Sequence, residues 1–182
     1  MTVTTQQQAT TSFEKLFWTW QGYKIQYTVM GTGRPLVLVH GFGASIGHWR
    51  KNIPVLAAAG YQVFAIDLLG FGGSDKPPLN YTVEVWVELL KDFCKAHIQE
   101  PAIFIGNSIG GLLSLMVVAE HPEVAAGGVL INCAGGLSHK DVMFLGALFP
   151  LGDGALVFND EIQILHSQLG CQSFCPLPLL CC

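Results

Sequence analysis

The chain has 182 residues, of which 51% are hydrophobic and only 12% charged, enough for one sizeable core and unlike an intrinsically disordered protein. The net charge is −4, and the sequence holds only two arginines, Arg34 and Arg50, so no basic stripe exists and no nucleic-acid partner is expected. Polar residues and prolines interrupt the apolar region 162–182, so no transmembrane segment is expected.

Residues 1–16 are expected to form a disordered N-terminal tail. Its first twelve residues, MTVTTQQQATTS, contain no charged side chain and no apolar stretch, which excludes a secretory signal. The tail also lacks the arginines of an organellar transit peptide. The expected location is therefore the cytoplasm, or the plastid stroma if the protein comes from a photosynthetic eukaryote.

The first elements alternate between strand and helix. Aromatic and β-branched residues flank the pair Gln21-Gly22, which predicts a hairpin over 17–31. The apolar run PLVLVHG (35–41) is typical of a buried parallel strand. A helical region follows in which Trp49, Ile53, Leu56 and Ala57 share one face, with Pro54 beginning a new turn.

The alternation continues to residue 135. Buried strands are predicted at 61–70, 101–106 and 127–135, and a helix that Thr82 could cap is predicted from its apolar stripe. A second helix over 109–120 ends before Pro122, with Ile109, Leu112, Leu113, Met116 and Val117 facing inward. Strands that alternate with helices predict an α/β fold with a doubly wound, mostly parallel sheet.

The sequence changes character after residue 136. Residues 162–182 contain no Asp, Glu, Lys or Arg, and four of the six cysteines lie in the last twelve residues. No paired C-x-x-C spacing is present, so no metal site is expected. We interpret the end as an atypical Cys-rich tail.

The segment GNSIG (106–110) fits the pattern G-x-S-x-G between a predicted strand and a predicted helix. Such a turn holds a serine in a strained backbone conformation that exposes its hydroxyl, and the next helix directs its positive N-terminal end at a developing oxyanion. Gly106 and Gly110 leave room for the backbone. The alternative is that Ser108 is only a helix N-cap.

The segment His40-Gly41-Phe42-Gly43 closes the strand predicted at 35–41. An oxyanion hole in such a sheet needs two backbone N–H groups, one from the residue after the nucleophile and one from this loop. The candidates are Ile109 and Phe42, with Gly41 and Gly43 as loop glycines. We expect His40 to brace the loop and not to act as a base.

Four segments, VHGFGASIGHWRKNIPVLA, AIDLLGFGGSDKP, IGNSIGG and LINCAGG, together resemble the α/β-hydrolase superfamily. The similarity covers about residues 17–138. The four segments are most similar to the sequences of the cyanobacterial and chloroplast branch with pheophytinase and chlorophyll dephytylase. The resemblance implies that Ser108 is the nucleophile, with Phe42 and Ile109 as oxyanion donors. It implies a small-molecule ester substrate, such as a phytyl ester of a chlorophyll-type pigment, and no cofactor.

The resemblance also divides the chain. Residues 17–135 correspond to the N-terminal part of the hydrolase core, and 136–182 to the start of a cap region followed by the Cys-rich tail. A serine at the nucleophile position implies acyl transfer, because epoxide hydrolases and haloalkane dehalogenases of this superfamily carry aspartate there.

The rest of the triad is not recognisable. In the superfamily the acid follows the seventh strand and the histidine follows the eighth, so the expected core lacks its last two strands. We expect the strand at 127–133 to be an exposed edge through which copies of the chain could self-associate. Asp67 and Asp75 are expected to be structural. The remaining candidates for the base are poor: His48, His97, His121, His139 and His166, the last with Asp160 as orienter.

Three readings of function stay open. The first is a serine hydrolase of carboxylic esters that forms an acyl-enzyme at Ser108. The second is a catalytically incompetent chain that binds a ligand or partner, if it acts at all. The third is other serine chemistry on the same elbow, such as perhydrolysis or C–C bond hydrolysis.

Overall fold

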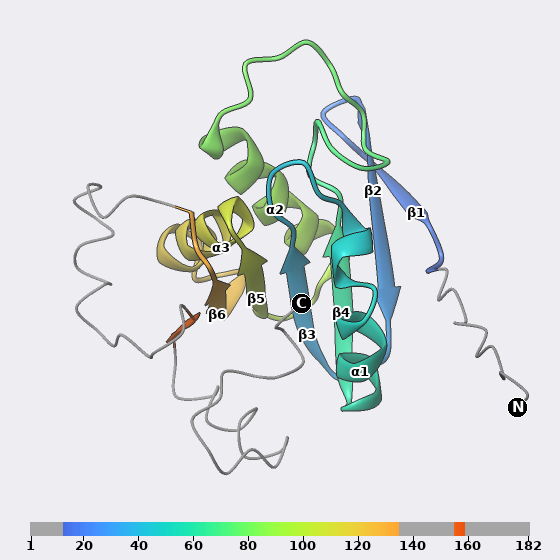
Figure 1. Cartoon of the computed structure of the whole chain (residues 1–182), viewed down its shortest axis with the longest axis vertical. Coiled ribbons are helices and arrows are strands. Elements are labelled where there is room, and N and C mark those ends of the chain that lie inside the picture. Colours follow the sequence, from blue (N-terminus) through green and yellow to red (C-terminus); the bar gives the residue numbers. More distant parts are fainter. Residues whose placement is uncertain (1–12, 135–154, 159–182) are drawn as a thin grey trace, which may run out of the picture.

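A computed structural model describes residues 13–134 and 155–158. One seven-stranded sheet runs through these residues in the order β1-β2-β4-β3-β5-β6-β7 (Figure 1). Its strands are β1 (Leu16–Trp20), β2 (Tyr23–Met30), β3 (Arg34–Val39), β4 (Tyr61–Ile66), β5 (Ala102–Asn107), β6 (Ala125–Ile131) and β7 (Ala155–Phe158). The four central strands β4, β3, β5 and β6 are parallel, as the sequence predicts, and the outer strands pair antiparallel.

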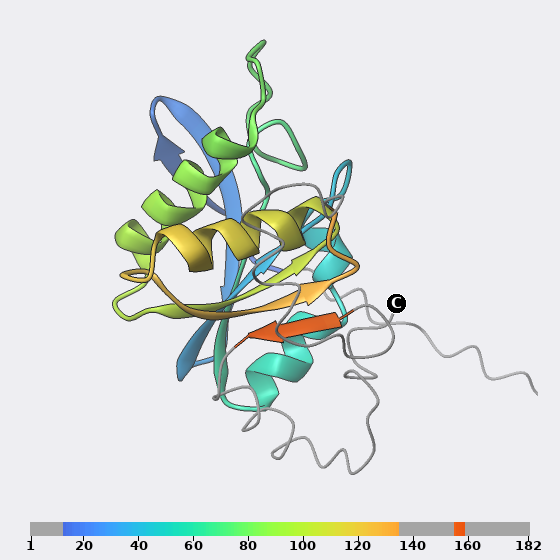
Figure 2. The same cartoon turned by 90° about the vertical axis from the view of Figure 1, so that its left-hand side faces the viewer.

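Helices cover both faces of the sheet (Figure 2). The short 3-10 helix η1 (Ile46–Trp49) and helix α1 (Asn52–Ala58) pack on one face, with strand residues such as Leu36, Leu38 and Val63. Helices α2 (Val83–His97) and α3 (Ile109–Glu120) pack on the other, with Val37, Val39 and other alternate residues of the same strands. Because successive side chains of a strand point to opposite faces, each central strand contributes to both cores. The doubly wound α/β fold is confirmed.

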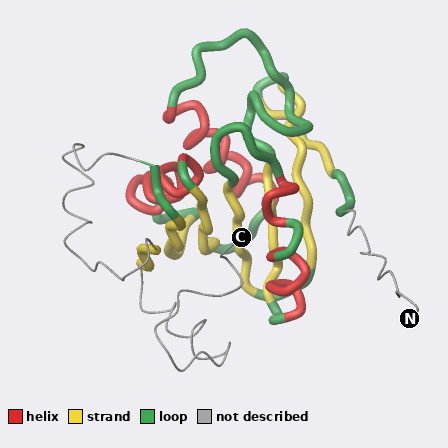
Figure 3. The backbone as a smooth tube through the Cα atoms, in the orientation of Figure 1, coloured by secondary structure: helices red, strands yellow, loops and turns green. Residues whose placement is uncertain are grey.

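Most predicted elements are present, as the path of the backbone shows (Figure 3). The hairpin turns at Gln21 and Gly22, whose φ angles of 48° and 85° match the left-handed conformation of a two-residue turn. Pro54 lies in the first turn of α1, where its missing N–H costs nothing. Thr82 precedes α2, but its side chain makes no capping hydrogen bond.

The inward face of α3 differs from the prediction. Leu113 and Val117 are buried, but Ile109, Leu112 and Met116 are only half-buried. Gly110 and Ser114 are buried instead, and the Ser114 hydroxyl donates to the Gly110 carbonyl over 2.7 Å. These small residues let the helix backbone approach the sheet closely. The prediction missed them because it took only large apolar residues as inward-facing.

The expectation of an exposed edge at 127–133 is wrong for the described structure. β7 pairs antiparallel with β6, from Gly128 opposite Phe158 to Ile131 opposite Ala155. The backbone groups of β6 therefore find partners within the chain, and β6 is not an edge strand. The disordered tail predicted over 1–16 is too long at its C-terminal end, because Phe13 packs against the core and β1 begins at Leu16. The rest of that prediction, over 1–12, lies outside the described residues, as do the predictions for 136–182 except at β7.

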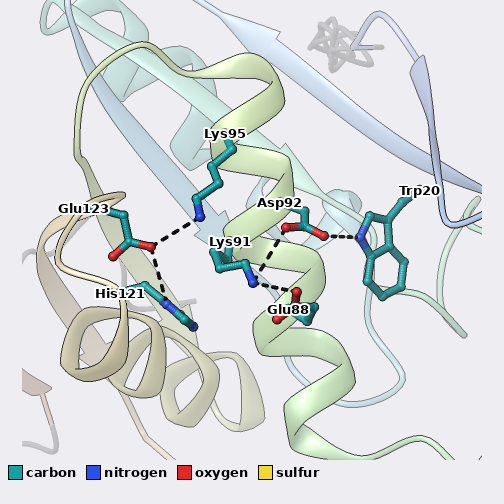
Figure 4. A network of polar contacts seen from close by, with 7 residues as sticks. All are labelled: Trp20, Glu88, Lys91, Asp92, Lys95, His121 and Glu123. Carbon is teal, nitrogen blue, oxygen red and sulfur yellow. Dashed lines mark hydrogen bonds and ion pairs between the residues drawn. The ribbon is translucent and has the colours of Figure 1, made fainter.

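A polar network on the outer face of α2 ties together elements far apart in the sequence (Figure 4). The Trp20 indole N–H donates to Asp92 over 2.9 Å, and Lys91 pairs with Glu88 and Asp92. Lys95 and His121 both reach Glu123, in the loop between α3 and β6. The network joins β1, α2 and this loop. None of the helices in residues 13–134 combines the length and the apolar character that a membrane span needs.

The core thiol of Cys94 is expected to resist alkylation. Burial in the core raises the pKa of Cys94 to about 12, so about one thiol in ten thousand is ionised at pH 8. Peptide mapping after iodoacetamide treatment should find Cys94 unmodified in the folded chain and modified in urea. Modification of Cys94 at the same rate with and without urea would contradict its placement.

Candidate active site

Ser108 lies in the turn between β5 and α3, with φ 57° and ψ −121°. Few non-glycine residues adopt this conformation, so the surrounding contacts must hold it in place. The Ser108 N–H donates to the Ile131 carbonyl over 3.0 Å, and the Ser108 carbonyl accepts from Gly111 and Ala134, each over 2.9 Å. Ser108, the nucleophile candidate, is thus anchored to β6, to α3 and to the residues after β6. It lies in a sharp strand-to-helix turn, the elbow (residues 106–110).

The glycines of the motif lie where no side chain fits. A Cβ atom on Gly106 would overlap the Gly110 carbonyl, and one on Gly110 would overlap the Val39 carbonyl at the end of β3. One on Gly41 would come within 3.2 Å of the Ser108 Cβ. The structure therefore brings the loop after β3 directly against the elbow.

The two candidate oxyanion donors flank this contact. Phe42 follows Gly41 in the loop after β3 and is 76% exposed. Its ring lies edge-on against Phe71, with 5.2 Å between the ring centroids. Ile109 is the first residue of α3, where backbone N–H groups have no intrahelical partner and the helix dipole is positive. Gly43, with φ 71°, lets the loop turn back, so that the Ala44 N–H reaches the Gly41 carbonyl over 3.2 Å.

His40 braces the loop, as the sequence predicts. Its side chain is fully buried, with Nδ1 2.7 Å from the Gly41 carbonyl, and Nε2 accepts from the Leu68 N–H over 3.1 Å. Both ring nitrogens are occupied, so neither can accept a proton from Ser108. Burial lowers the pKa of His40 and outweighs the opposing effects of the Gly41 hydrogen bond and Asp67.

This burial predicts an acid-sensitive fold. Burial also lowers the pKa values of His48 and His97 below the ordinary 6.5. The unfolded chain therefore binds protons first, and stability falls as the pH drops below about 6.5. Urea unfolding should give a lower midpoint at pH 5.5 than at pH 7.5, above the range in which carboxylates titrate. A midpoint that is unchanged or higher at pH 5.5 would contradict this assignment.

Asp67, directly after β4, has a structural role, as expected. It is fully buried, and its Oδ1 accepts from the Ile46 N–H over 2.6 Å. Its Oδ2 accepts from the Gly73 N–H over 2.7 Å and from the Gln26 side chain over 2.9 Å. One carboxylate thereby fixes η1, the loop over residues 70–73 and β2 relative to each other. Asp75 is exposed and accepts from the Lys24 N–H over 2.7 Å.

Asp67→Asn is expected to lower the free energy of unfolding by about 2 kcal/mol, because the amide nitrogen would face a buried N–H donor. Asp75→Asn, the matched change at an exposed site, should cost less than about 0.5 kcal/mol. Urea titration followed by tryptophan fluorescence measures both. Equal losses in the two variants would contradict the assigned role of Asp67.

One polar contact of the elbow was not predicted. The Asn107 side-chain nitrogen, one residue before Ser108, lies 3.3 Å from the His48 Nε2. Asn107 occupies a variable position of the G-x-S-x-G motif, and the expectation for His48 is only that of a poor base candidate. No spacing rule joins these two residues, because the contact depends on how η1 packs beside β5.

The described structure provides no triad partner for Ser108. No described histidine is hydrogen-bonded to Ser108, and His97 and His121 lie at the far ends of α2 and α3. The described residues directly after β6 are Asn132, Cys133 and Ala134, and none of them is a carboxylate. His139, His166 and Asp160 lie outside the described residues. No group of three or more His, Cys, Asp or Glu in the described ranges could hold a metal ion.

A family model described as the alpha/beta hydrolase fold matches residues 34–154. The chain therefore belongs to the α/β-hydrolase fold family, and the superfamily resemblance is confirmed.

Three relatives illustrate the similarity. A 2-hydroxy-6-oxo-6-(2'-aminophenyl)hexa-2,4-dienoic acid hydrolase of Metapseudomonas resinovorans is 41% identical over 118 residues, 63% of this chain and 40% of that protein. Bifunctional epoxide hydrolase 2 of Rattus norvegicus is 38% identical over 56% of this chain and 19% of its own length. The structure of a serine hydrolase involved in carbazole degradation superposes with a TM-score of 0.65 and 33% identity, over 86% of this chain and 62% of that one. The chain thus spans less than half the length of the first two proteins and 62% of the third.

Proposed function

We propose that the protein is a serine hydrolase in which Ser108 forms an acyl-enzyme. The observation that supports this most is the strained backbone of Ser108, φ 57° and ψ −121°, packed against Gly41 of the loop after β3. Strain of this kind persists only where the surrounding structure imposes it, and it is common at active sites. A simple helix N-cap does not require it, because N-cap residues ordinarily have extended backbone angles.

The proposed reaction has two stages. The Ser108 Oγ attacks the carbonyl carbon of the substrate and loses its proton to a general base, which the described residues do not provide. The N–H groups of Phe42 and Ile109 stabilise the negative oxygen of the tetrahedral intermediate. The intermediate expels the leaving group, which takes up a proton, and water then hydrolyses the acyl-enzyme and frees Ser108.

Carboxylic esters are the proposed substrate class. The exposed Phe42 ring and its neighbour Phe71 offer an apolar surface beside the elbow, which suits an ester with an apolar chain. A phytyl ester of a chlorophyll-type pigment, implied by the resemblance, is the finer form of this proposal. It would place the protein in a plastid stroma or in the cytoplasm of a photosynthetic cell.

C–C bond hydrolysis is the second candidate. The relative from Metapseudomonas resinovorans is named for a 6-oxo dienoic acid, a substrate that contains no ester. It is 41% identical to this chain over 118 residues. The same serine and oxyanion donors could serve a ketone in place of an ester. Epoxide hydrolysis is not proposed, because position 108 is serine and not aspartate.

A substrate panel tests the proposal. The purified chain is incubated with p-nitrophenyl butyrate, with a chlorophyll-type phytyl ester and with a 6-oxo-6-aryl-hexa-2,4-dienoic acid, each beside its Ser108→Ala variant. Turnover of an ester that the variant loses supports ester hydrolysis. Preferential turnover of the dienoic acid moves the assignment to C–C hydrolysis. Equal rates for both chains on all three substrates would overturn the proposal for this chain.

A further inference from the structure

The loop after β3 and the elbow after β5 are joined by a side-chain hydrogen bond. Asn107 is the last residue of β5 and directly precedes Ser108, and its Nδ2 lies 3.3 Å from Nε2 of His48 in η1. Both side chains are half-buried. The His48 ring lies edge-on against Trp49, with 4.7 Å between centroids, and Trp49 is 1% exposed. A buried neighbour therefore fixes the orientation of the imidazole.

The loop has two further anchors. The carboxylate of Asp67 accepts from the Ile46 N–H, and the His40 Nδ1 lies 2.7 Å from the Gly41 carbonyl. These anchors come from β4 and from the end of β3. The contact between His48 and Asn107 attaches the same loop to β5, the strand that carries the nucleophile.

We propose that His48 is a positioning residue that, through Asn107, sets the distance between the oxyanion donors on the loop and on α3. This inference rests on the proposed function, because it assumes that the Phe42 and Ile109 N–H groups act on one oxyanion. Such donors work only when both lie about 2.7–3.1 Å from the oxyanion. A displacement of about 1 Å at a reacting centre can cost about 10²-fold in rate.

Two substitutions separate this role from general stability. His48→Leu keeps an apolar contact with Trp49 but removes the acceptor for Asn107. His48→Gln restores an amide oxygen that can accept from it. His121→Gln is the matched control, since His121 is a half-buried histidine at the C-terminal end of α3, away from the elbow.

The first measurement is hydrogen–deuterium exchange of the full chain, which needs no catalysis. We expect His48→Leu to speed exchange at residues 42–48 and 107–109, with the thermal midpoint nearly unchanged. His48→Gln and His121→Gln should exchange like the unsubstituted chain. Unchanged exchange in His48→Leu would overturn the inference.

The second measurement is turnover of p-nitrophenyl butyrate. We expect His48→Leu to lower kcat about 10- to 100-fold with little change in KM, and His48→Gln to recover most of the loss. Equal kcat values for all variants, or an equal loss in the Leu and Gln variants, would overturn the positioning role. If the unsubstituted chain shows no turnover that depends on Ser108, the proposed function fails, and exchange alone decides whether His48 holds the loop.

Discussion

Ser108→Ala is expected to lower kcat/KM for p-nitrophenyl butyrate by at least about 10³-fold, because no acyl-enzyme can form without the hydroxyl. Any remaining rate would come from binding and from the oxyanion donors, which the substitution leaves in place. Initial rates at several substrate concentrations measure the change. Retention of most of the activity would show that another group is the nucleophile.

Comparing Ser108→Gly with Ser108→Ala isolates the cost of backbone strain, because both variants lack the hydroxyl. Glycine adopts φ 57° and ψ −121° readily, whereas alanine carries the same Cβ penalty as serine. We expect the glycine variant to exceed the alanine variant in free energy of unfolding by about 1 kcal/mol, with both variants inactive. Urea titration decides this. Equal stability of the two variants would contradict a strained elbow.

Gly110→Ala is expected to lower the free energy of unfolding by about 3 kcal/mol. The added Cβ would overlap the Val39 carbonyl and come within 2.6 Å of the His40 carbonyl. Both contacts are backbone atoms at the end of β3, so no flexible side chain can move aside. The first turn of α3 would have to shift, which would also displace Ile109 and Ser108.

Gly47→Ala provides the matched control. A Cβ at Gly47 would meet only the Ser45 hydroxyl, at the ordinary contact distance of 3.4 Å. Its effect on stability should stay within about 0.5 kcal/mol. Urea unfolding followed by tryptophan fluorescence measures both variants. A similar small effect for Gly110→Ala would contradict the close approach of α3 to β3.

The fold could be predicted because its signals are local. Continuous apolar runs predict the central strands, and amphipathic stretches predict the helices between them. Element ends were less well predicted, because tertiary contacts decide them. The strand predicted at 61–70 ends at Ile66, where Asp67 begins a turn held by hydrogen bonds to three elements. The strand predicted at 127–135 begins two residues earlier, at Ala125, and ends at Ile131.

In the candidate site, too, local features could be predicted and contacts between distant residues could not. The G-x-S-x-G spacing between a strand and a helix predicted the elbow, because the motif has a fixed local geometry. The pairing of His48 with Asn107 joins residues 59 positions apart and has no sequence signature. The pairing of β6 with β7 likewise depends on a strand more than twenty residues further along the chain, and the edge prediction failed for that reason.

The most direct test of the account is the mass of the chain after brief exposure to p-nitrophenyl butyrate and an acid quench. We expect a butyryl group, at most one per chain, which peptide mapping places on Ser108 and which the Ser108→Ala variant lacks. A butyryl group on any other residue would contradict Ser108 as the nucleophile. So would p-nitrophenol release that depends on Ser108 in a chain that carries no acyl group when it is quenched within the first turnover.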